Sequence, residues 1–117
     1  MKLLCVVSKP PFSGSKVIEQ LEAAMVAAVF DIEVSLLFLG DGVNCLVEGQ
    51  DGTELGSRSP SKLISGLEMY DIKNLYVDDK SLDLLSGVKL ISGIQSLDTG
   101  RQRVLFAETD LVFSGSA

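Results

Sequence analysis

Hydrophobic residues in this chain form short continuous runs separated by longer, helically spaced stripes. The continuous runs cover residues 2–8, 33–39, 74–78, 88–94 and 110–113. Runs of this length are typical of strands that are buried on both faces of a parallel sheet. Helical signals follow every run except the last, so the pattern predicts an α/β fold built from right-handed crossovers.

The segment 16–30 shows the clearest helical spacing. Its core-facing stripe is predicted to contain Val17, Ile18, Leu21, Ala24, Met25, Ala28 and Val29. Shorter helices are predicted at about 43–47, 61–69 and 79–85. A final helix is expected to run from a cap at Ser96 to about Thr109.

Together these elements predict a small flavodoxin-like domain. At 117 residues the chain is expected to form one domain, residues 1–117. Its five-stranded sheet should be mostly parallel and should carry helices on both faces. The polar, glycine-rich stretch 48–60 is predicted to be an exposed loop.

The side of helix 16–30 that opposes its core-facing stripe also becomes apolar. Ala23, Val26, Ala27 and Phe30 lie there, and a monomer would expose them together. Hydrophobic residues make up 46% of the chain, more than a small core readily buries. These four residues are therefore interface candidates, with Phe30 as the central anchor. Alternatively, they cover another part of the chain's own core.

Charge and composition exclude several functions. The formal net charge is −6 and the chain has no histidine. An acidic domain binds nucleic acid poorly, and without histidine there is no Ser-His-Asp or Cys-His activation. No apolar run reaches the length of a membrane span. The first run is too short for a signal sequence, and the two cysteines are expected to be free thiols, so we expect a cytoplasmic protein.

Two polar clusters could in principle hold a ligand. The loop from Ser13 to Lys16 follows the first strand, where flavodoxin-like proteins bind phosphate. With no Trp and only two Tyr to stack on the ring, we expect no flavin there, and a capped turn is the preferred interpretation. Asp41, Asp78 and Asp79 lie near strand ends and could hold Mg²⁺, but turn residues and helix caps explain them better. No cofactor or metal is therefore predicted.

The two cysteines have different expected environments. Cys5 lies inside the first strand, where burial makes a thiol inert. Cys45 is expected in the first turn of the helix that follows Gly42, where a helix N-terminus lowers a thiol pKa. A reactive role for Cys45 is thus an alternative to simple packing.

Several short motifs resemble those of one family. The most specific are Asp41-Gly42-Val43 and Tyr70-Asp71-Ile72; the accompanying ones are Phe38-Leu39-Gly40, Gly49-Gln50, Leu67-Glu68-Met69, Tyr76-Val77, Ser81-Leu82 and Asp110-Leu111-Val112-Phe113. Over nearly its whole length the chain resembles the DsrE/DsrF-like superfamily, and most closely the TusC/DsrF branch.

The resemblance implies a subunit of a TusB–TusC–TusD complex, with TusD/DsrE-like and TusB/DsrH-like partners. Such complexes relay persulfide sulfur toward 2-thiolation of the tRNA wobble uridine. In this family the sulfur-carrying cysteine belongs to the TusD/DsrE subunit, after its third strand. Asp78 occupies that position here. Because a carboxylate cannot carry a persulfide, the resemblance implies a subunit without catalytic activity. The alternatives are a DsrF-like subunit of a sulfur-oxidation complex and a free-standing thiol carrier that uses Cys45.

Overall fold

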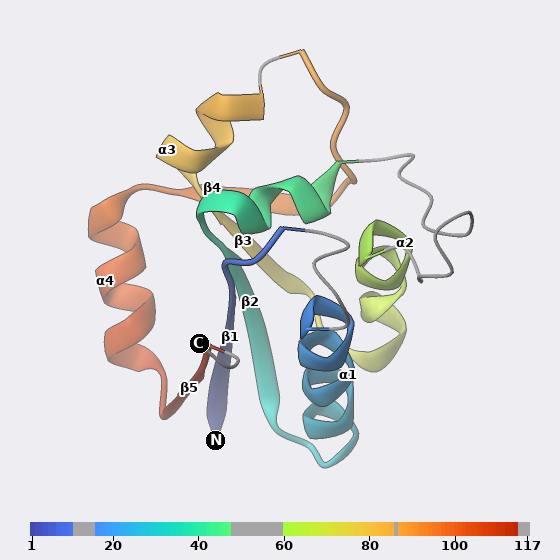
Figure 1. Ribbon diagram of the computed structural model, residues 1–117. Helices are drawn as coiled ribbons and strands as arrows, with labels where there is room; N and C mark the ends of the chain where they lie inside the picture. Colours follow the sequence, from blue (N-terminus) through green and yellow to red (C-terminus); the bar gives the residue numbers. More distant parts are fainter. Residues whose placement is uncertain (11–15, 48–59, 86, 115–117) are drawn as a thin grey trace.

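A five-stranded parallel sheet forms the centre of the molecule (Figure 1). The computed structural model describes residues 1–10, 16–47, 60–85 and 87–114. The strands are β1 (Lys2–Val7), β2 (Glu33–Phe38), β3 (Asn74–Asp78), β4 (Ile94–Leu97) and β5 (Leu111–Phe113). They are ordered β4-β3-β2-β1-β5, and every neighbouring pair is parallel. The predicted α/β class and the parallel five-stranded sheet are confirmed.

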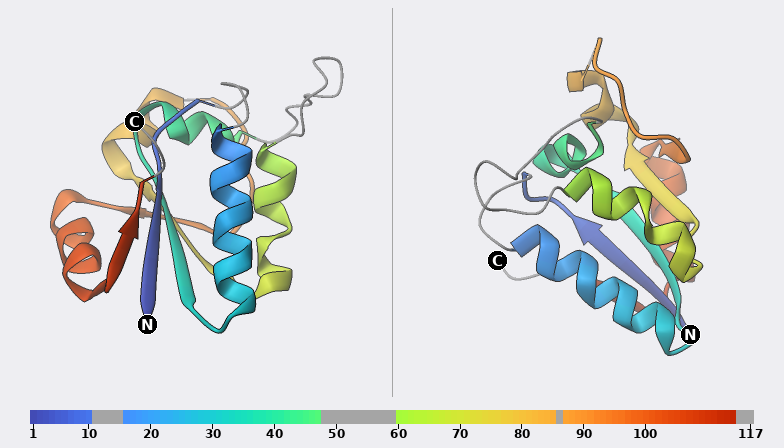
Figure 2. Two further views of the ribbon diagram at one scale, coloured as in Figure 1. Left: turned by 60° about the horizontal axis from the view of Figure 1, so that its bottom comes forward. Right: turned by 90° about the vertical axis from the view of Figure 1, so that its right-hand side faces the viewer.

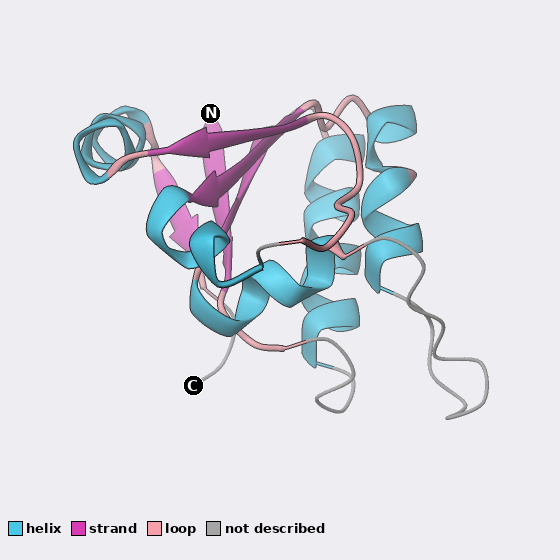
Figure 3. Cartoon of the chain, turned by 90° about the horizontal axis from the view of Figure 1, so that it is seen from above, coloured by secondary structure: helices cyan, strands magenta, loops and turns pink. Residues whose placement is uncertain are grey.

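Helices cover both faces of this sheet (Figures 2 and 3). The α-helices are α1 (Lys16–Val29), α2 (Pro60–Ser65), α3 (Asp79–Leu82) and α4 (Thr99–Glu108). Short 3₁₀ helices are η1 (Gly40–Leu46), η3 (Leu67–Tyr70) and η4 (Asp83–Leu85). α1 and α2 lie on one side of the sheet and α4 on the other. Among the described residues, no helix has the length and apolar character needed to cross a membrane.

The two faces of the sheet are buried to different extents. Alternate strand residues, such as Leu3, Leu36 and Val77, point into a large core beneath α1 and α2. The opposite face contributes a small cluster of Leu4, Val6 and Leu37, against which Leu105 of α4 packs. No residue of α4 is itself fully buried. Most of the hydrophobic stabilisation therefore comes from the α1/α2 side.

The fourth strand lies further along the chain than its apolar pattern predicts. The run 88–94 is not a strand, except for its last residue, Ile94. Instead Leu90 forms an isolated antiparallel bridge with Val47, and Ile91 donates a backbone hydrogen bond to Leu46. This run is therefore a connecting segment and not a strand, and its apolar character reflects burial in that connection. β4 is an edge strand with exposed residues at its centre, so it needs no apolar pattern.

The last helix also begins later than expected, because Asp98 rather than Ser96 caps it. The Asp98 carboxylate accepts a hydrogen bond from the Arg101 backbone N–H at 2.8 Å. Ser96 belongs to β4. Gly100 consequently sits in the first turn of α4, where its low helix propensity costs less than in a helix interior.

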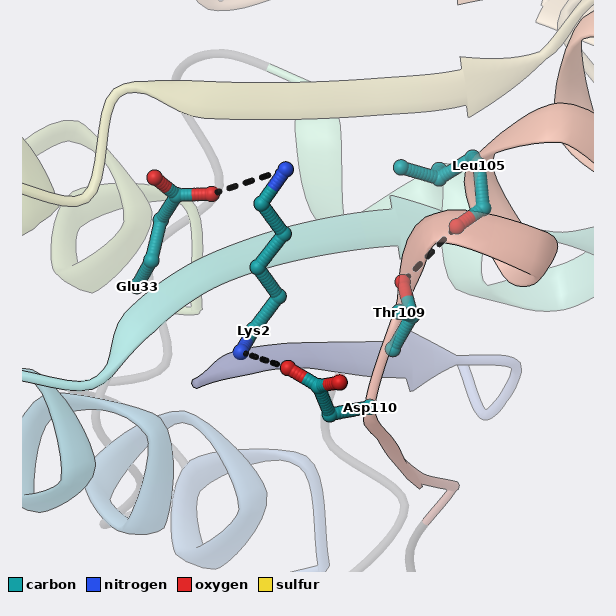
Figure 4. Close-up of polar contacts among 5 residues, drawn as sticks. All are labelled: Lys2, Glu33, Leu105, Thr109 and Asp110. Carbon is teal, nitrogen blue, oxygen red and sulfur yellow. Dashed lines mark hydrogen bonds and ion pairs between the residues drawn. The ribbon is translucent and has the colours of Figure 1, made fainter.

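Polar contacts join the ends of β1, β2 and β5 at the amino edge of the sheet (Figure 4). The Lys2 backbone N–H donates to the Asp110 carboxylate at 2.7 Å, and the Lys2 ammonium lies 3.9 Å from Glu33. The Thr109 hydroxyl donates to the Leu105 carbonyl oxygen at 2.8 Å and so closes the end of α4. These contacts fix how α4 leads into the edge strand β5.

Candidate functional site

At the carboxyl edge of the sheet, η1 lies very close to the end of β1. Leu39 donates a backbone hydrogen bond to the Val7 carbonyl oxygen at 3.0 Å, which brings the start of η1 across the strand. A Cβ on Gly42 would overlap that same carbonyl oxygen. Gly40 supplies the left-handed conformation with φ +51°. The Gly-Asp-Gly turn thus needs its two glycines for different reasons.

Asp78, at the end of β3, is the centre of a polar network. One carboxylate oxygen accepts hydrogen bonds from the Ser81 backbone N–H at 3.2 Å and the Ser81 hydroxyl at 2.7 Å. The other accepts from the Gln102 side-chain amide at 2.7 Å. Ser81 also accepts a hydrogen bond from the Gly40 backbone N–H at 2.9 Å. Asp78 therefore caps α3 and links it to α4, while Ser81 links it to η1.

The hydrogen bonds to Asp78 stabilise its charged form. Partial burial acts to raise the pKa of Asp78, but the bonds from Ser81 and Gln102, with backbone N–H groups of Ser81 and Lys80, hold this pKa below its usual range. The carboxylate is fully engaged as a cap, which agrees with the sequence-based interpretation of Asp78.

Both cysteines are buried free thiols. Burial raises the pKa of Cys5 to about 12, against a smaller opposing effect of its hydrogen bond with Gln20. Burial likewise raises the pKa of Cys45 to about 12, and the Cys45 thiol donates to the Lys9 carbonyl oxygen at 3.7 Å. A thiol in this state is a poor nucleophile near neutral pH.

The predicted setting of Cys45 is wrong in one respect. The helix begins at Gly40, two residues before Gly42, so Cys45 is near its end and not in its first turn. A helix N-terminus therefore does not lower the thiol pKa, and desolvation raises it instead.

The remaining predicted polar residues do not form a ligand cluster. Asp41 is exposed on η1, and Asp79 follows Asp78 as the first residue of α3. Within residues 1–10, 16–47, 60–85 and 87–114, no group of three or more acidic or cysteine side chains could hold a metal ion. Of the Ser13–Lys16 loop, only Lys16 is described, as the exposed first residue of α1; the rest lies outside the described residues.

Comparison with known proteins identifies the family. The model of the DsrE/DsrF-like family matches residues 1–112. The chain belongs to the DsrE/DsrF-like family. The "Intracellular sulfur oxidation protein DsrF" of Allochromatium vinosum is 30% identical, covering 97% of this chain and 95% of that protein. A "Protein TusC homolog" of Pseudomonas aeruginosa is 31% identical, with 96% of each chain covered. These relatives identify the TusC/DsrF branch.

A solved structure agrees on the fold. The ychN protein of E. coli superimposes with a TM-score of 0.84 at 16% identity, covering 97% of this chain and 98% of that one. At this identity the similarity concerns the fold alone. It shows that the two proteins share the overall α/β fold described above.

The predicted interface residues of this DsrE/DsrF-like chain lie on α1 and at Phe30 directly after it, and they fall into two groups. Ala23, Val26 and Phe30 are exposed, with Val26 at 57% and Phe30 at 74%. Ala27 is half-buried and packs against the core, so this residue does not belong to the exposed side. Whether the exposed three meet a partner stays a prediction.

A second correction concerns Val29, which was predicted to face the core but is 65% exposed. A helix turns by about 100° per residue. The buried residues of the helix, which define the centre of the stripe, are Val17, Gln20, Leu21 and Ala24. Ala27 falls near the edge of that stripe, whereas Val29 falls outside it. The spacing alone did not identify Ala27 because alanine fits either environment.

Two glutamines make tertiary hydrogen bonds that no sequence pattern predicts. Gln102 reaches Asp78 only because β4 and α4 lie where they do. The Gln20 side chain of α1 is buried, and its amide donates to the Val6 carbonyl oxygen at 2.6 Å. The contact with Ser81, by contrast, was detectable, since an Asp N-cap accepts a hydrogen bond from the backbone N–H of the second or third helical residue.

Proposed function

We propose that this chain is a TusC-like subunit of a sulfur-relay complex and does not itself carry sulfur. In this proposal the complex supports 2-thiolation of the tRNA wobble uridine in the cytoplasm. TusD/DsrE-like and TusB/DsrH-like proteins are the partners, and the chain makes no direct contact with nucleic acid. Its relationship to proteins named TusC and DsrF supports a role in sulfur relay.

The observation that carries the proposal is the state of Asp78. The family resemblance aligns this residue with the sulfur-carrying cysteine of the TusD/DsrE subunit. In persulfide transfer a thiolate attacks the terminal sulfur of the donor persulfide, the donor thiolate leaves, and the acceptor becomes the persulfide. A carboxylate cannot perform this step. Here it is also committed to three hydrogen bonds that hold α3 and α4.

The two thiols of the chain support the same conclusion. Both are buried, and their pKa values of about 12 leave almost no thiolate at neutral pH. The alternative of a free-standing carrier that uses Cys45 would need this thiol to become exposed and ionised. We therefore assign the chain a non-enzymatic role.

A DsrF-like role in sulfur oxidation is the second candidate. The specific observation in its favour is that DsrF of Allochromatium vinosum matches about as well as the TusC homolog of Pseudomonas aeruginosa. Both roles use the same kind of subunit within an assembly. They differ in the process that receives the sulfur, which is tRNA thiolation in one role and sulfur oxidation in the other.

Co-purification and gene deletion test the proposal. A tagged chain should co-purify with TusB-like and TusD-like proteins of the same organism, and its deletion should remove the 2-thio group from wobble uridine. Loss of growth on reduced sulfur with thiolation intact would favour the DsrF-like role. A chain that remains alone, together with intact thiolation and sulfur oxidation, would refute both.

A further inference from the structure

A cavity of about 240 Å³ lies at the amino edge of the sheet, between α2, η3 and the segments that lead into β3 and β4. Its floor consists of buried residues that belong to the main core, namely Ile64, Ile72 and Leu75. Its rim is exposed and more polar, and consists of Ser65, Glu68, Lys73, Ser92 and Gly93. The cavity therefore joins an apolar interior to a charged opening.

The two charged residues of the rim have opposite signs. Glu68 lies in the first turn of η3, and Lys73 directly precedes β3. Within the part of the chain that the structure describes, neither side chain forms an ion pair or a hydrogen bond. Lys73 can thus donate to a carboxylate at the opening of the cavity, and Glu68 can accept from an ammonium group there.

The size of the cavity limits what it can hold. Sites for drug-sized ligands usually have volumes of roughly 300–1,000 Å³. This cavity, at about 240 Å³, lies below that range. It has room for a short aliphatic chain with a small polar head group, and it is too small for a nucleotide.

We propose that this cavity binds a free α-amino acid with an aliphatic side chain. The side chain contacts the apolar floor, the carboxylate pairs with the Lys73 ammonium, and the ammonium pairs with the Glu68 carboxylate. A small ion of one sign would satisfy only one of the two rim charges, and an apolar molecule would satisfy neither. Asp78 is at the opposite end of β3 from Lys73, so the proposal does not depend on a role in sulfur relay.

Three compounds with the same hydrocarbon chain test this assignment on the full protein chain. L-Leucine has both charged groups, isocaproate lacks the ammonium, and isopentylamine lacks the carboxylate. Binding is followed through the backbone amide shifts in two-dimensional NMR spectra. Contacts between exposed charges are individually weak, so leucine should bind with a dissociation constant of about 1 mM. Each analogue should bind at least about threefold more weakly, because it loses one of the two contacts.

Two variants separate the two rim charges. Lys73→Gln should weaken the binding of leucine and isocaproate several-fold without weakening that of isopentylamine, because only the contact with a carboxylate is removed. Glu68→Gln should weaken leucine and isopentylamine without weakening isocaproate. Lys80→Gln on α3 and Glu108→Gln on α4 make the same changes at exposed positions outside the cavity and serve as controls. Circular dichroism checks the fold of each variant.

Each outcome decides the proposal. Tighter binding of leucine than of both analogues, with reciprocal losses in the two rim variants, supports it. If the three compounds bind equally, the cavity recognises only the hydrocarbon chain and the proposal is wrong. It is also wrong if about 10 mM leucine shifts no amide around the cavity, or if the rim variants bind all three compounds as the controls do. If a rim variant does not fold, the three compounds on the wild-type chain decide alone.

Discussion

At the scale of single residues, Asp78 shows how a carboxylate becomes part of the scaffold at the carboxyl edge. Its oxygens accept hydrogen bonds from Ser81 in α3 and from Gln102 in α4, so one side chain connects two elements to the end of β3. The same residue type at a strand end would suggest metal binding if it were considered without these partners. Its hydrogen-bond donors, and not its charge alone, therefore define its role.

We expect Asp78→Ala to lower the free energy of unfolding by about 2 kcal/mol at pH 7, because a helix cap and a charge-assisted hydrogen bond are lost. Partner binding should persist if Asp78 has no part in sulfur transfer. Urea denaturation measures the stability, and co-purification measures the binding. Asp41→Ala, at an exposed carboxylate on η1, serves as the control and should change little.

The stabilisation by Asp78 should also depend on pH. The pKa of Asp78 is lowered in the folded chain relative to its ordinary value of 3.8. A depressed folded pKa gives stability that is present above the unfolded pKa and is lost as the pH falls through the folded pKa. The difference in unfolding free energy between wild type and Asp78→Ala should therefore be constant above about pH 5 and shrink below pH 4. A difference that does not change on acidification would contradict this role.

Gly42 sets a steric limit on the same edge. A Cβ at this position would overlap the Val7 carbonyl oxygen, which is backbone and cannot move aside as a side chain would. Gly42→Ala should therefore displace η1 and destabilise the chain by about 2 kcal/mol or more. Gly66→Ala is a matched control, since the nearest atom to its added Cβ would be 3.6 Å away. Thermal denaturation of both variants measures the effect; equal melting temperatures would contradict the close approach.

At the scale of elements, the sequence predicts the strands well where they are buried on both faces. Continuous apolar runs identified β1, β2 and β3, whose residues pack into cores on either side of the sheet. The run 88–94 has the same appearance but packs as a connection beside the end of η1, through Leu90 and Ile91. A run of hydrophobic residues indicates that the segment is buried, and burial alone does not distinguish a central strand from a packed connection.

The candidate site was only partly predictable for a related reason. Asp78 and its capping role follow from local spacing, since Ser81 is three residues away. The contact with Gln102 joins residues 24 positions apart and depends on the placement of β4, which the sequence pattern gave incorrectly. The burial of Cys45 depends likewise on how η1 packs against the end of β1. Long-range contacts of this kind require the tertiary structure.

The exposed side of α1 carries the next prediction. Val26→Asp with Phe30→Ala should abolish partner binding or shift the chain toward a monomer while the fold persists, because both side chains are largely exposed. Burying a Phe side chain contributes roughly 1.5–3 kcal/mol. Size-exclusion chromatography with light scattering measures assembly, and circular dichroism measures the fold. A folded double variant with unchanged assembly would remove this side of α1 from the interface.

At the scale of the whole molecule, several large apolar side chains lie on the surface, whereas both thiols lie in the interior. Exposed apolar side chains occur on α1 and η3 on one side of the sheet, on α4 on the other side, and on the edge strand β5. The thiols lie inside, where ionisation is unfavourable. This distribution is what the proposed role requires, in which the chain contacts other subunits and does not itself exchange sulfur.

This distribution predicts the response of the chain to thiol reagents. At pH 8, iodoacetamide should leave the folded chain unmodified, because both thiols are buried with pKa values of about 12. In urea, both thiols should react, since unfolding exposes them and restores their ordinary pKa. Incubation with a persulfide donor should likewise add no sulfur to the folded chain. Intact mass spectrometry measures each result. A single adduct on Cys45 of the folded chain would mean that η1 opens readily, and it would make this chain a sulfur carrier after all.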